Sequence, residues 1–208
     1  MIEELKQAII DGDDEKALTL IKSLLEYGMQ AHDVLQKGLI AGMDVVGHRF
    51  KNYEMYLPEV IQCATAMKGA MEELKPILAQ TEDASLGKVA IATIEGDVHD
   101  IGKNLVSMML EGAGFEMYDL GVDVSVDKII SSAQETSCSI IGISALLTTT
   151  MLGLESVIKK IKGKIHDAKV MVGGAPLTRE FADKVGGDGF APDALRAINL
   201  TKSLVGKA

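Results

Sequence analysis

The sequence predicts an all-α bundle of four helices, followed by an α/β domain with a parallel five-stranded sheet and helices on both faces. Two observations support this. Before residue 86, apolar residues recur at the three-to-four-residue spacing of helices, whereas from Lys88 onward short apolar runs alternate with helical segments. The charge changes at the same place, with 8 basic and 15 acidic side chains in residues 1–85 but 13 and 15 in residues 86–208. We therefore expect a helical cap domain over 1–85 and a second domain over 86–208.

The first domain is predicted to contain four amphipathic helices. Asp13-Asp14-Glu15 places acidic groups at a helix start, where the helix dipole favours them, and Gly28 is typical of a helix end. The polar, aperiodic segment from Leu78 to Leu86 predicts a linker. The apolar faces of the four helices are formed by Leu5, Ile9 and Ile10; by Leu18, Ile21, Leu24 and Leu25; by Val34, Leu35, Leu39, Met43 and Val46; and by Val60, Ile61, Ala64, Met67 and Met71.

The second domain is predicted to alternate strands and helices, as in a Rossmann-like (flavodoxin-like) sheet buried on both faces. Ser125 is expected to cap one helix, and Pro192 to lie in the first turn of the last. The predicted strands are Val89–Ile94, Phe115–Asp119, Ile140–Ser144, Val170–Val172 and Gly189–Phe190. The predicted helices are Asp100–Gly112, Val126–Thr136, Met151–Lys162, Arg179–Val185 and Asp193–Leu204.

Composition excludes several classes of protein. The 208 residues carry a net charge of −9, which disfavours nucleic acid because phosphate binding needs a basic face. The two cysteines, Cys63 and Cys138, are far apart, which disfavours a disulfide framework or a four-ligand zinc site. The longest uncharged run, 136–154, contains seven Ser or Thr residues, which disfavours a membrane span. Since the N-terminus lacks the pattern of a signal peptide, we expect a cytoplasmic protein.

The loop after the first predicted strand carries a candidate site. Ligands of open α/β sheets bind beyond the carboxyl ends of the strands, and this end contains Asp97 and His99. Asp97 could accept a hydrogen bond from one ring nitrogen of His99, as in metal-ligating imidazoles. A plain hydrogen bond between a loop histidine and an aspartate fits the same two residues. A single imidazole suits a metal whose other positions are filled by a macrocycle, or a general base, although no candidate nucleophile is placed to use it.

Two further loops follow predicted strands at the same edge of the sheet. Residues 144–150 hold a cluster of hydroxyl groups, and residues 173–176 begin with two glycines, which let a bulky group lie against the backbone. The chain lacks the phosphate-binding pattern G-x-x-x-x-G-K-[ST], and Gly112-x-Gly114 ends a helix where a dinucleotide-binding fingerprint would open one.

These three loops resemble the signature of the cobalamin-binding domain. It consists of D-x-H-x-x-G (Asp97, His99, Gly102), then S-x-L (Ser144, Leu146), then G-G (Gly173, Gly174). The N-terminal part resembles the helical module that precedes this domain in cobalamin-dependent methionine synthase. Over nearly the whole chain, the sequence is most similar to the small corrinoid proteins of methylamine, methanol and aryl-ether methyltransferase systems.

The resemblance implies a bound cobalamin or related corrinoid (methylcobalamin) in the base-off state, with His99 as the lower cobalt ligand. Asp97 would hold His99, and the Thr150 hydroxyl would extend this relay. Gln36 departs from the glutamate of methionine synthase, so no contact is assigned to it. Contacts with the lower part of the cofactor would come from Asp97, Val98, His99, Asp100, Gly102, Ser144, Leu146, Thr148, Gly173, Gly174 and Ala175, and Phe50 and Leu57 would cap the upper face.

The function that the resemblance implies is that of a non-catalytic methyl-carrier subunit. A substrate-specific methyltransferase would load the methyl group, a second methyltransferase would pass it to a thiol or a tetrahydrofolate-type acceptor, and a reductive activator would restore the cofactor. One alternative is the cobalamin subunit of a carbon-skeleton mutase, against which the helical lid argues. Another is a cobalamin-dependent sensor, against which the absence of Trp and of a basic patch argues.

Overall fold

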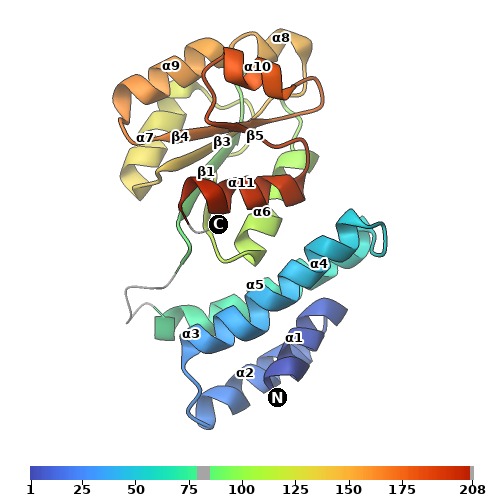
Figure 1. The fold of residues 1–208 in the computed structure, drawn as a ribbon. Coiled ribbons are helices and arrows are strands. Elements are labelled where there is room, and N and C mark those ends of the chain that lie inside the picture. Colours follow the sequence, from blue (N-terminus) through green and yellow to red (C-terminus); the bar gives the residue numbers. More distant parts are fainter. Residues whose placement is uncertain (79–84, 207–208) are drawn as a thin grey trace. The chain divides into compact units, whose positions relative to one another are not determined.

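The computed structural model describes residues 1–78 and 85–206 (Figure 1). They form two compact units. The helical unit comprises Met1–Ser85 together with Glu111–Gly114, and the α/β unit comprises Leu86–Leu110 and Phe115–Ala208.

The helical unit contains the four predicted helical rods. The predicted helix signals hold: the Asp13 carboxylate caps α2 by accepting a hydrogen bond from the Lys16 N–H at 3.0 Å, and Gly28 follows α2 with a φ of +83°. Leu78 is still helical, and residues 79–84 of the predicted linker lie outside the described residues. The first two rods are α1 (Ile2–Asp11) and α2 (Asp14–Glu26). The third is the unbroken run of α3 (Ala31–Asp33), the π-helical η1 (Val34–Ile40) and α4 (Ala41–Lys51), and the fourth is α5 (Leu57–Leu78).

Two glycines allow the third rod to lie close to α1. A Cβ atom on Gly38 would meet the Leu5 side chain at 2.7 Å, and one on Gly42 would meet Ile9 at 2.9 Å. The two glycines are four residues apart and therefore lie on one helical face. Larger residues at either position would push the rods apart, so the close packing of this bundle depends on both.

The α/β unit contains a five-stranded parallel sheet with the strand order β2-β1-β3-β4-β5. Helices α6 and α11 cover one face of the sheet, and α7, α9 and α10 cover the other (Figure 1). The strands are β1 (Lys88–Thr93), β2 (Glu116–Asp119), β3 (Ile140–Ser144), β4 (Lys169–Gly173) and β5 (Gly189–Phe190), and the helices are α6 (Ile101–Gly112), α7 (Val126–Thr136), α8 (Thr148–Met151), α9 (Leu154–Lys164), α10 (Arg179–Lys184) and α11 (Ala194–Leu204).

The predicted strands and helices of the α/β unit agree with the structure to within one residue at each end, except for the helix Met151–Lys162. The expected position of Pro192 is also wrong, and Ser125 is confirmed as a cap. The predicted helix Met151–Lys162 is two helices, because the hydroxyl-rich loop already forms the single turn α8 and α9 starts afresh after Gly153. Pro192 does not lie in the first turn of α11. Asp193 follows it and caps α11 through a hydrogen bond from the Arg196 N–H to its carboxylate at 2.8 Å.

The register of the sheet brings the three candidate loops to one edge. Thr93 at the end of β1 pairs with Ser144 at the end of β3, which pairs with Gly173 at the end of β4. The chain leaves β1 to form β2 on one side and returns to form β3 on the other. The crevice between the loops after β1 and β3 is therefore the topological switch point, where ligands of this architecture bind.

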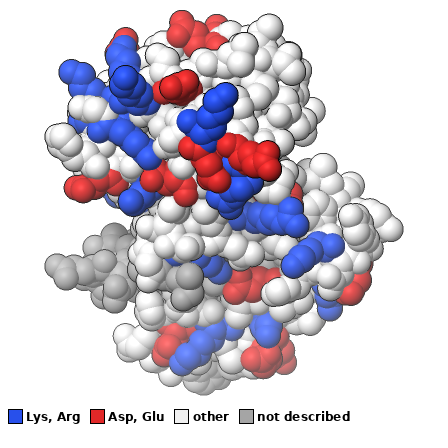
Figure 2. All heavy atoms as spheres, turned by 45° about the horizontal axis from the view of Figure 1, so that its top comes forward, with Lys and Arg blue, Asp and Glu red and all other residues white. Residues whose placement is uncertain are grey.

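Lysines gather along α9 on the surface of the α/β unit, and Figure 2 shows this concentration of basic side chains at its upper left. Two of them form ion pairs, Lys160 with Asp127 at 2.7 Å and Lys162 with Asp188 at 2.8 Å. Within residues 1–78 and 85–206, no helix combines the length and the apolar character needed to cross a membrane.

Both cysteine thiols are expected to resist labelling in the native protein. Cys63 and Cys138 are buried, and burial raises the pKa of the Cys63 thiol to about 11 and also raises the pKa of Cys138. A thiol reagent at pH 8 should therefore react with neither in the folded protein and with both in denaturant. Rapid labelling of the folded protein would contradict this burial.

Candidate functional site

Asp97 is the centre of the hydrogen-bond network at the switch point. Its side chain is fully buried, and its carboxylate accepts from groups of both neighbouring loops. Oδ1 accepts from the His99 ring at 2.7 Å and from the His99 backbone N–H at 3.1 Å. Oδ2 accepts from the backbone N–H groups of Leu146 at 2.6 Å and Leu147 at 3.2 Å, and from the Thr150 hydroxyl at 3.2 Å. One carboxylate thus joins the loop after β1 to the loop after β3.

The hydrogen bond predicted between Asp97 and His99 is present, and it fixes the state of the imidazole. The contact uses Nδ1, and a carboxylate can only accept, so Nδ1 carries the proton in the neutral ring. The other nitrogen, Nε2, then keeps its lone pair. The Thr93 hydroxyl also donates to the His99 carbonyl oxygen at 2.8 Å, which holds the backbone from below. The half-exposed ring is therefore oriented to offer Nε2 to a ligand outside the loop.

The environment of Asp97 keeps it ionised. Burial alone would raise its pKa, but hydrogen bonds from the Leu146 N–H, from the ring and N–H of His99 and from the Leu147 N–H outweigh burial. Together they hold the pKa of Asp97 well below the usual range of a carboxyl group. The imidazole is therefore hydrogen-bonded to a negatively charged carboxylate, as metal-ligating imidazoles commonly are.

The Thr150 hydroxyl lies where the sequence predicts, within reach of the carboxylate. It is also 3.0 Å from the Leu147 carbonyl oxygen, so its single proton has two acceptors to choose from. The turn α8 brings Thr150 back toward Asp97, because the Met151 N–H bonds to the Leu147 carbonyl oxygen at 3.0 Å.

Sequence reasoning missed the contribution of the loop after β2, which is described together with the last strand residue Asp119 as residues 119–123. The Asp123 carboxylate accepts from the Gly96 N–H at 2.7 Å, and the Asp123 N–H donates to the Asp97 carbonyl oxygen at 2.9 Å. Asp119 forms an ion pair with Lys103 of α6, whose side chain is only 2% exposed. The sequence signal that could have indicated this ion pair was a lysine directly after the D-x-H-x-x-G motif together with an aspartate at the end of a predicted strand.

Large apolar side chains are exposed in the segment that carries His99 and in the segment that follows β3. Val98 is 70% exposed and Ile101 is 79% exposed, on either side of the histidine, and Leu152 after α8 is 72% exposed. Leu146 and Leu147 are also exposed by more than a third. Apolar side chains of this size so exposed around one polar group are typical of a binding surface. Of these, Val98 and Leu146 were predicted, whereas Ile101, Leu147 and Leu152 were missed.

The glycines of these motifs differ in what a side chain at each position would meet. A Cβ atom on Gly102 would meet nothing within 4 Å, so this position leaves open space beside the loop. Gly174, with a φ of +136°, lies directly on the loop after β3, because a Cβ there would be 2.8 Å from the Ala145 carbonyl carbon. A Cβ on Gly173 would be 2.9 Å from the Ala191 carbonyl oxygen. Gly173 and Gly174 therefore allow close approach of protein backbone, whereas a side chain at Gly102 would extend into open space.

The other predicted contacts of the α/β unit lie near the same edge. Asp100 precedes α6 and bonds to Asn104 at 3.0 Å, and Ser144 is the half-buried last residue of β3. Thr148 begins α8, and Ala175 follows the glycine pair, both with exposed side chains. The structure thus brings all the predicted α/β residues to the loops after β1, β3 and β4.

Phe50 and Leu57 belong to the helical unit. Phe50 lies near the end of α4 and is half-buried, and Leu57 begins α5 and is partly exposed. Between them the chain exposes two tyrosines, Tyr53 and Tyr56, which sequence reasoning missed. Gln36 lies in η1 and is half-buried, between the buried Leu35 and the exposed Lys37.

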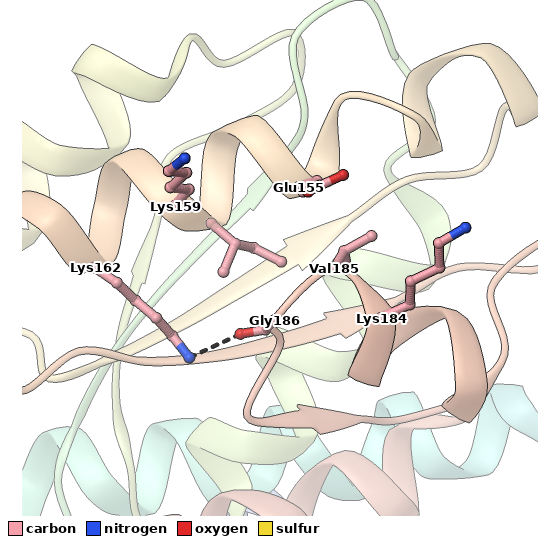
Figure 3. Close-up of a pocket in the computed structure, with 7 residues that line it drawn as sticks. Glu155, Lys159, Lys162, Lys184, Val185 and Gly186 are labelled. Atoms are coloured by element: carbon pink, nitrogen blue, oxygen red, sulfur yellow. Dashed lines mark hydrogen bonds between the residues drawn. The ribbon is translucent and has the colours of Figure 1, made fainter.

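A depression on the surface of the α/β unit is separate from these loops. It is lined by residues of α9 and of the end of α10, and it is bridged by a hydrogen bond from Lys162 Nζ to the Gly186 carbonyl oxygen at 2.8 Å (Figure 3). None of its lining residues belongs to the loops after β1, β3 or β4. It therefore has no part in the arrangement around His99.

The residues present fit a corrinoid. A fixed imidazole offers one nitrogen to a metal, the surrounding apolar side chains suit the face of a macrocycle, and Gly102 leaves space beside them. Two family models, each described as "B12 binding domain", match the chain, one over residues 87–199 and the other over residues 1–75.

Known proteins with similar sequences and structures agree with this fit. A corrinoid protein of Desulfitobacterium hafniense is 42% identical over all of this chain and 98% of that protein. A dimethylamine corrinoid protein of Methanosarcina barkeri is 41% identical over 99% of this chain and 97% of that protein. Among solved structures, a cobalamin-binding protein of D. hafniense has a TM-score of 0.79 at 30% identity, covering 98% of each chain. The methanol:cobalamin methyltransferase complex of M. barkeri has a TM-score of 0.86 at 26% identity, covering 100% of this chain and 80% of that one. The chain therefore belongs to the family of corrinoid proteins, with B12 binding domains over both its helical and its α/β parts.

Proposed function

We propose that this protein carries a methyl group on the cobalt of a bound corrinoid, with the His99 imidazole as the lower ligand and the cofactor's own base displaced. The observation that carries the proposal is the His99 ring, held by the buried Asp97 carboxylate at 2.7 Å with Nε2 free for a metal. When bound, the corrinoid supplies a cobalt ion that accepts a methyl group and gives it up again.

The chain's own groups hold and tune the ligand. Asp97 fixes the tautomer of His99, and the N–H groups of Leu146 and Leu147 keep Asp97 charged in its buried position. Asp97 accepts the Nδ1 hydrogen bond at one oxygen and the Thr150 hydroxyl hydrogen bond at the other, so the carboxylate that faces the imidazole is also held by the loop after β3. The carboxylate would thereby keep the Nε2 lone pair available to a metal.

The remaining predicted residues are assigned to binding. Val98, Asp100 and Gly102 are assigned to the lower part of the cofactor. Ser144, Leu146, Thr148, Gly173, Gly174 and Ala175 are assigned to the displaced nucleotide tail. By family resemblance, Phe50 and Leu57 of the helical unit are assigned to the upper corrin face, where apolar groups exclude water from the reacting methyl group.

The proposed partners are methyltransferases. Relatives are named as dimethylamine and trimethylamine corrinoid proteins, and one structural relative is part of a methanol:cobalamin methyltransferase complex. We infer a substrate-specific methyltransferase that loads this chain, a second methyltransferase that unloads it to a thiol or a tetrahydrofolate-type acceptor, and a reductive activator, all in the cytoplasm. The relatives do not favour the mutase-subunit or sensor alternatives.

Replacing His99 with glycine tests the ligand assignment. The protein reconstituted with hydroxocobalamin and reduced to Co(II) should show the electron paramagnetic resonance splitting of one nitrogen ligand, and H99G should lose it and change its visible spectrum. His166→Gly, an exposed histidine of the same unit, is the control and should leave both unchanged. An H99G spectrum identical to that of the wild-type protein would refute His99 as the lower ligand.

A further inference from the structure

We propose that the loop after β2, residues 119–123, positions His99 for cobalt, and that Asp123 is its main positioning residue. This inference rests on the proposed ligation by His99. The two hydrogen bonds by which Asp123 holds the His99 loop go to backbone groups of that loop and not to the imidazole. The Asp123 Oδ1 atom accepts from the Gly96 N–H at 2.7 Å, and the Asp123 N–H donates to the Asp97 carbonyl oxygen at 2.9 Å.

The backbone of Asp123 adopts the left-handed conformation, which is unfavourable for residues other than glycine unless contacts stabilise it. Its φ is +52°, in the left-handed region that few residues other than glycine adopt, and it faces Gly96, whose φ is +83°. Both bonds from Asp123 to the His99 loop depend on this conformation, since the N–H and the carboxylate point to the same segment. Left-handed residues without such a constraint are rare outside turns, and they gather at functional sites.

The same loop also holds the other end of the His99 segment. Asp119 Oδ1 accepts from Lys103 Nζ at 2.6 Å and from the Gly121 N–H at 2.9 Å. Lys103 belongs to the first turn of α6, directly after the histidine, and its ammonium group is buried with Asp119 and Asn104 as partners. Residues 96–103 are thus fixed at their start by Asp123 and at their end by Asp119.

The placement of these contacts separates two tasks around the histidine. The loop after β3 reaches the Asp97 side chain and sets the charge and tautomer of the ligand. The loop after β2 reaches the His99 segment through the backbone of Gly96 and Asp97 and through the side chain of Lys103, so it sets where the ligand stands. Removing the Asp123 carboxylate should therefore weaken and disorder the nitrogen–cobalt bond without changing the chemistry of the imidazole.

The test compares two replacements of Asp123. Asp123→Gly removes the acceptor and adopts a φ of +52° freely, whereas Asp123→Asn keeps an acceptor oxygen and tolerates the left-handed region. In the Co(II) form of the protein loaded with hydroxocobalamin, D123G should lose at least half of the nitrogen-split resonance and bind the corrinoid about tenfold more weakly. D123N should restore both to within about twofold, as expected for an oxygen acceptor that retains the hydrogen bond.

Two further variants keep the test decisive. Ser137, at the end of α7, has a φ of +57° and is exposed, so S137G introduces the same kind of substitution away from the site and should behave as wild type. Lys103→Met releases the other end of the loop while leaving an apolar side chain in its place, and it should also reduce the nitrogen splitting. Wild-type splitting and affinity in both D123G and K103M would overturn the inference.

A measurement without cofactor separates this inference from the proposed function. In the corrinoid-free protein, amide hydrogen exchange of the segment 95–100 should be at least tenfold faster in D123G than in wild type or S137G. If the loaded wild-type protein shows no nitrogen splitting, the ligation proposal fails, while the exchange result still reports on the loop. If the wild-type protein shows the splitting and D123G keeps wild-type splitting, affinity and exchange, only the positioning role fails.

Discussion

Replacing Gly174 with alanine is expected to destabilise the α/β unit by about 3 kcal/mol or more. At a φ of +136° a residue with a side chain is strained, which costs of order 1–3 kcal/mol. The added methyl group would also collide with the carbonyl group of Ala145, and overpacking of this kind typically costs a further 1–3 kcal/mol. Urea unfolding followed by circular dichroism, with the transition of the α/β unit analysed separately, measures the loss.

The matched control is Gly186→Ala in the same unit. Gly186 also has a positive φ, of +82°, but the nearest atom to an added Cβ, on Ile158, is 4.0 Å away. G186A therefore has only the conformational penalty, about 1–2 kcal/mol. Equal destabilisation by G174A and G186A would show that the contact with Ala145 does not matter.

The Gly174 substitution should also abolish corrinoid binding. Ala145 directly precedes Leu146, whose N–H donates to the Asp97 carboxylate at 2.6 Å. A displaced Ala145 carbonyl would move this N–H and loosen Asp97, so the effect would reach His99 through the backbone. Titration with hydroxocobalamin of the folded fraction of G174A measures this loss.

The second large effect is expected from Asp97→Asn. The Asp97 carboxylate accepts hydrogen bonds at both oxygens. An amide has only one acceptor oxygen, and its NH₂ group would face the donors that the second carboxylate oxygen now satisfies. Leaving buried donors unsatisfied should lower the free energy of unfolding by about 2–4 kcal/mol. Loss of the carboxylate behind the imidazole should weaken corrinoid binding by about 10- to 100-fold. Urea unfolding and corrinoid titration measure the two effects independently.

Asp127→Asn is the control for loss of an acid. Asp127 is an exposed partner of Lys160, and pairs of this kind contribute less than about 1 kcal/mol. The pH dependence gives a further check. Because the folded pKa of Asp97 is lowered, its stabilisation is complete above the unfolded pKa of about 3.9 and is lost as the pH falls below it. The difference between wild type and D97N should therefore be constant from pH 7 to about pH 5 and shrink in stronger acid; a difference that grows there would contradict it.

The sequence was sufficient for the sheet and for the side chains of the motifs. Alternating apolar runs place β3 at Ile140–Ser144, and D-x-H-x-x-G alone brings Asp97 and His99 into reach of each other. It could not reveal the donors that keep Asp97 charged. Leu146 and Leu147 act through backbone N–H groups, which every residue but proline has, so only the fold shows which of them face the carboxylate.

Other features could not be predicted because they depend on packing between distant segments. The sequence shows the glycine pair but not that Gly174 must lack a Cβ because of the backbone of Ala145, which is 29 positions earlier in the sequence. Asp123 looks like an ordinary turn residue until its partner Gly96 is placed opposite it. The π-helical turn η1 keeps the apolar spacing of an α-helix closely enough that periodicity does not distinguish the two.

The carboxylate of Asp97 has a consequence for how the cofactor enters. Because all five of its hydrogen bonds come from groups of this chain and join the loops after β1 and β3, the position of His99 does not depend on contacts with the cofactor. Corrinoid binding then does not have to order this part of the chain, and the entropy that ordering would consume remains available as affinity. The hydrogen bonds to one buried carboxylate should therefore favour binding of the cofactor at low concentration.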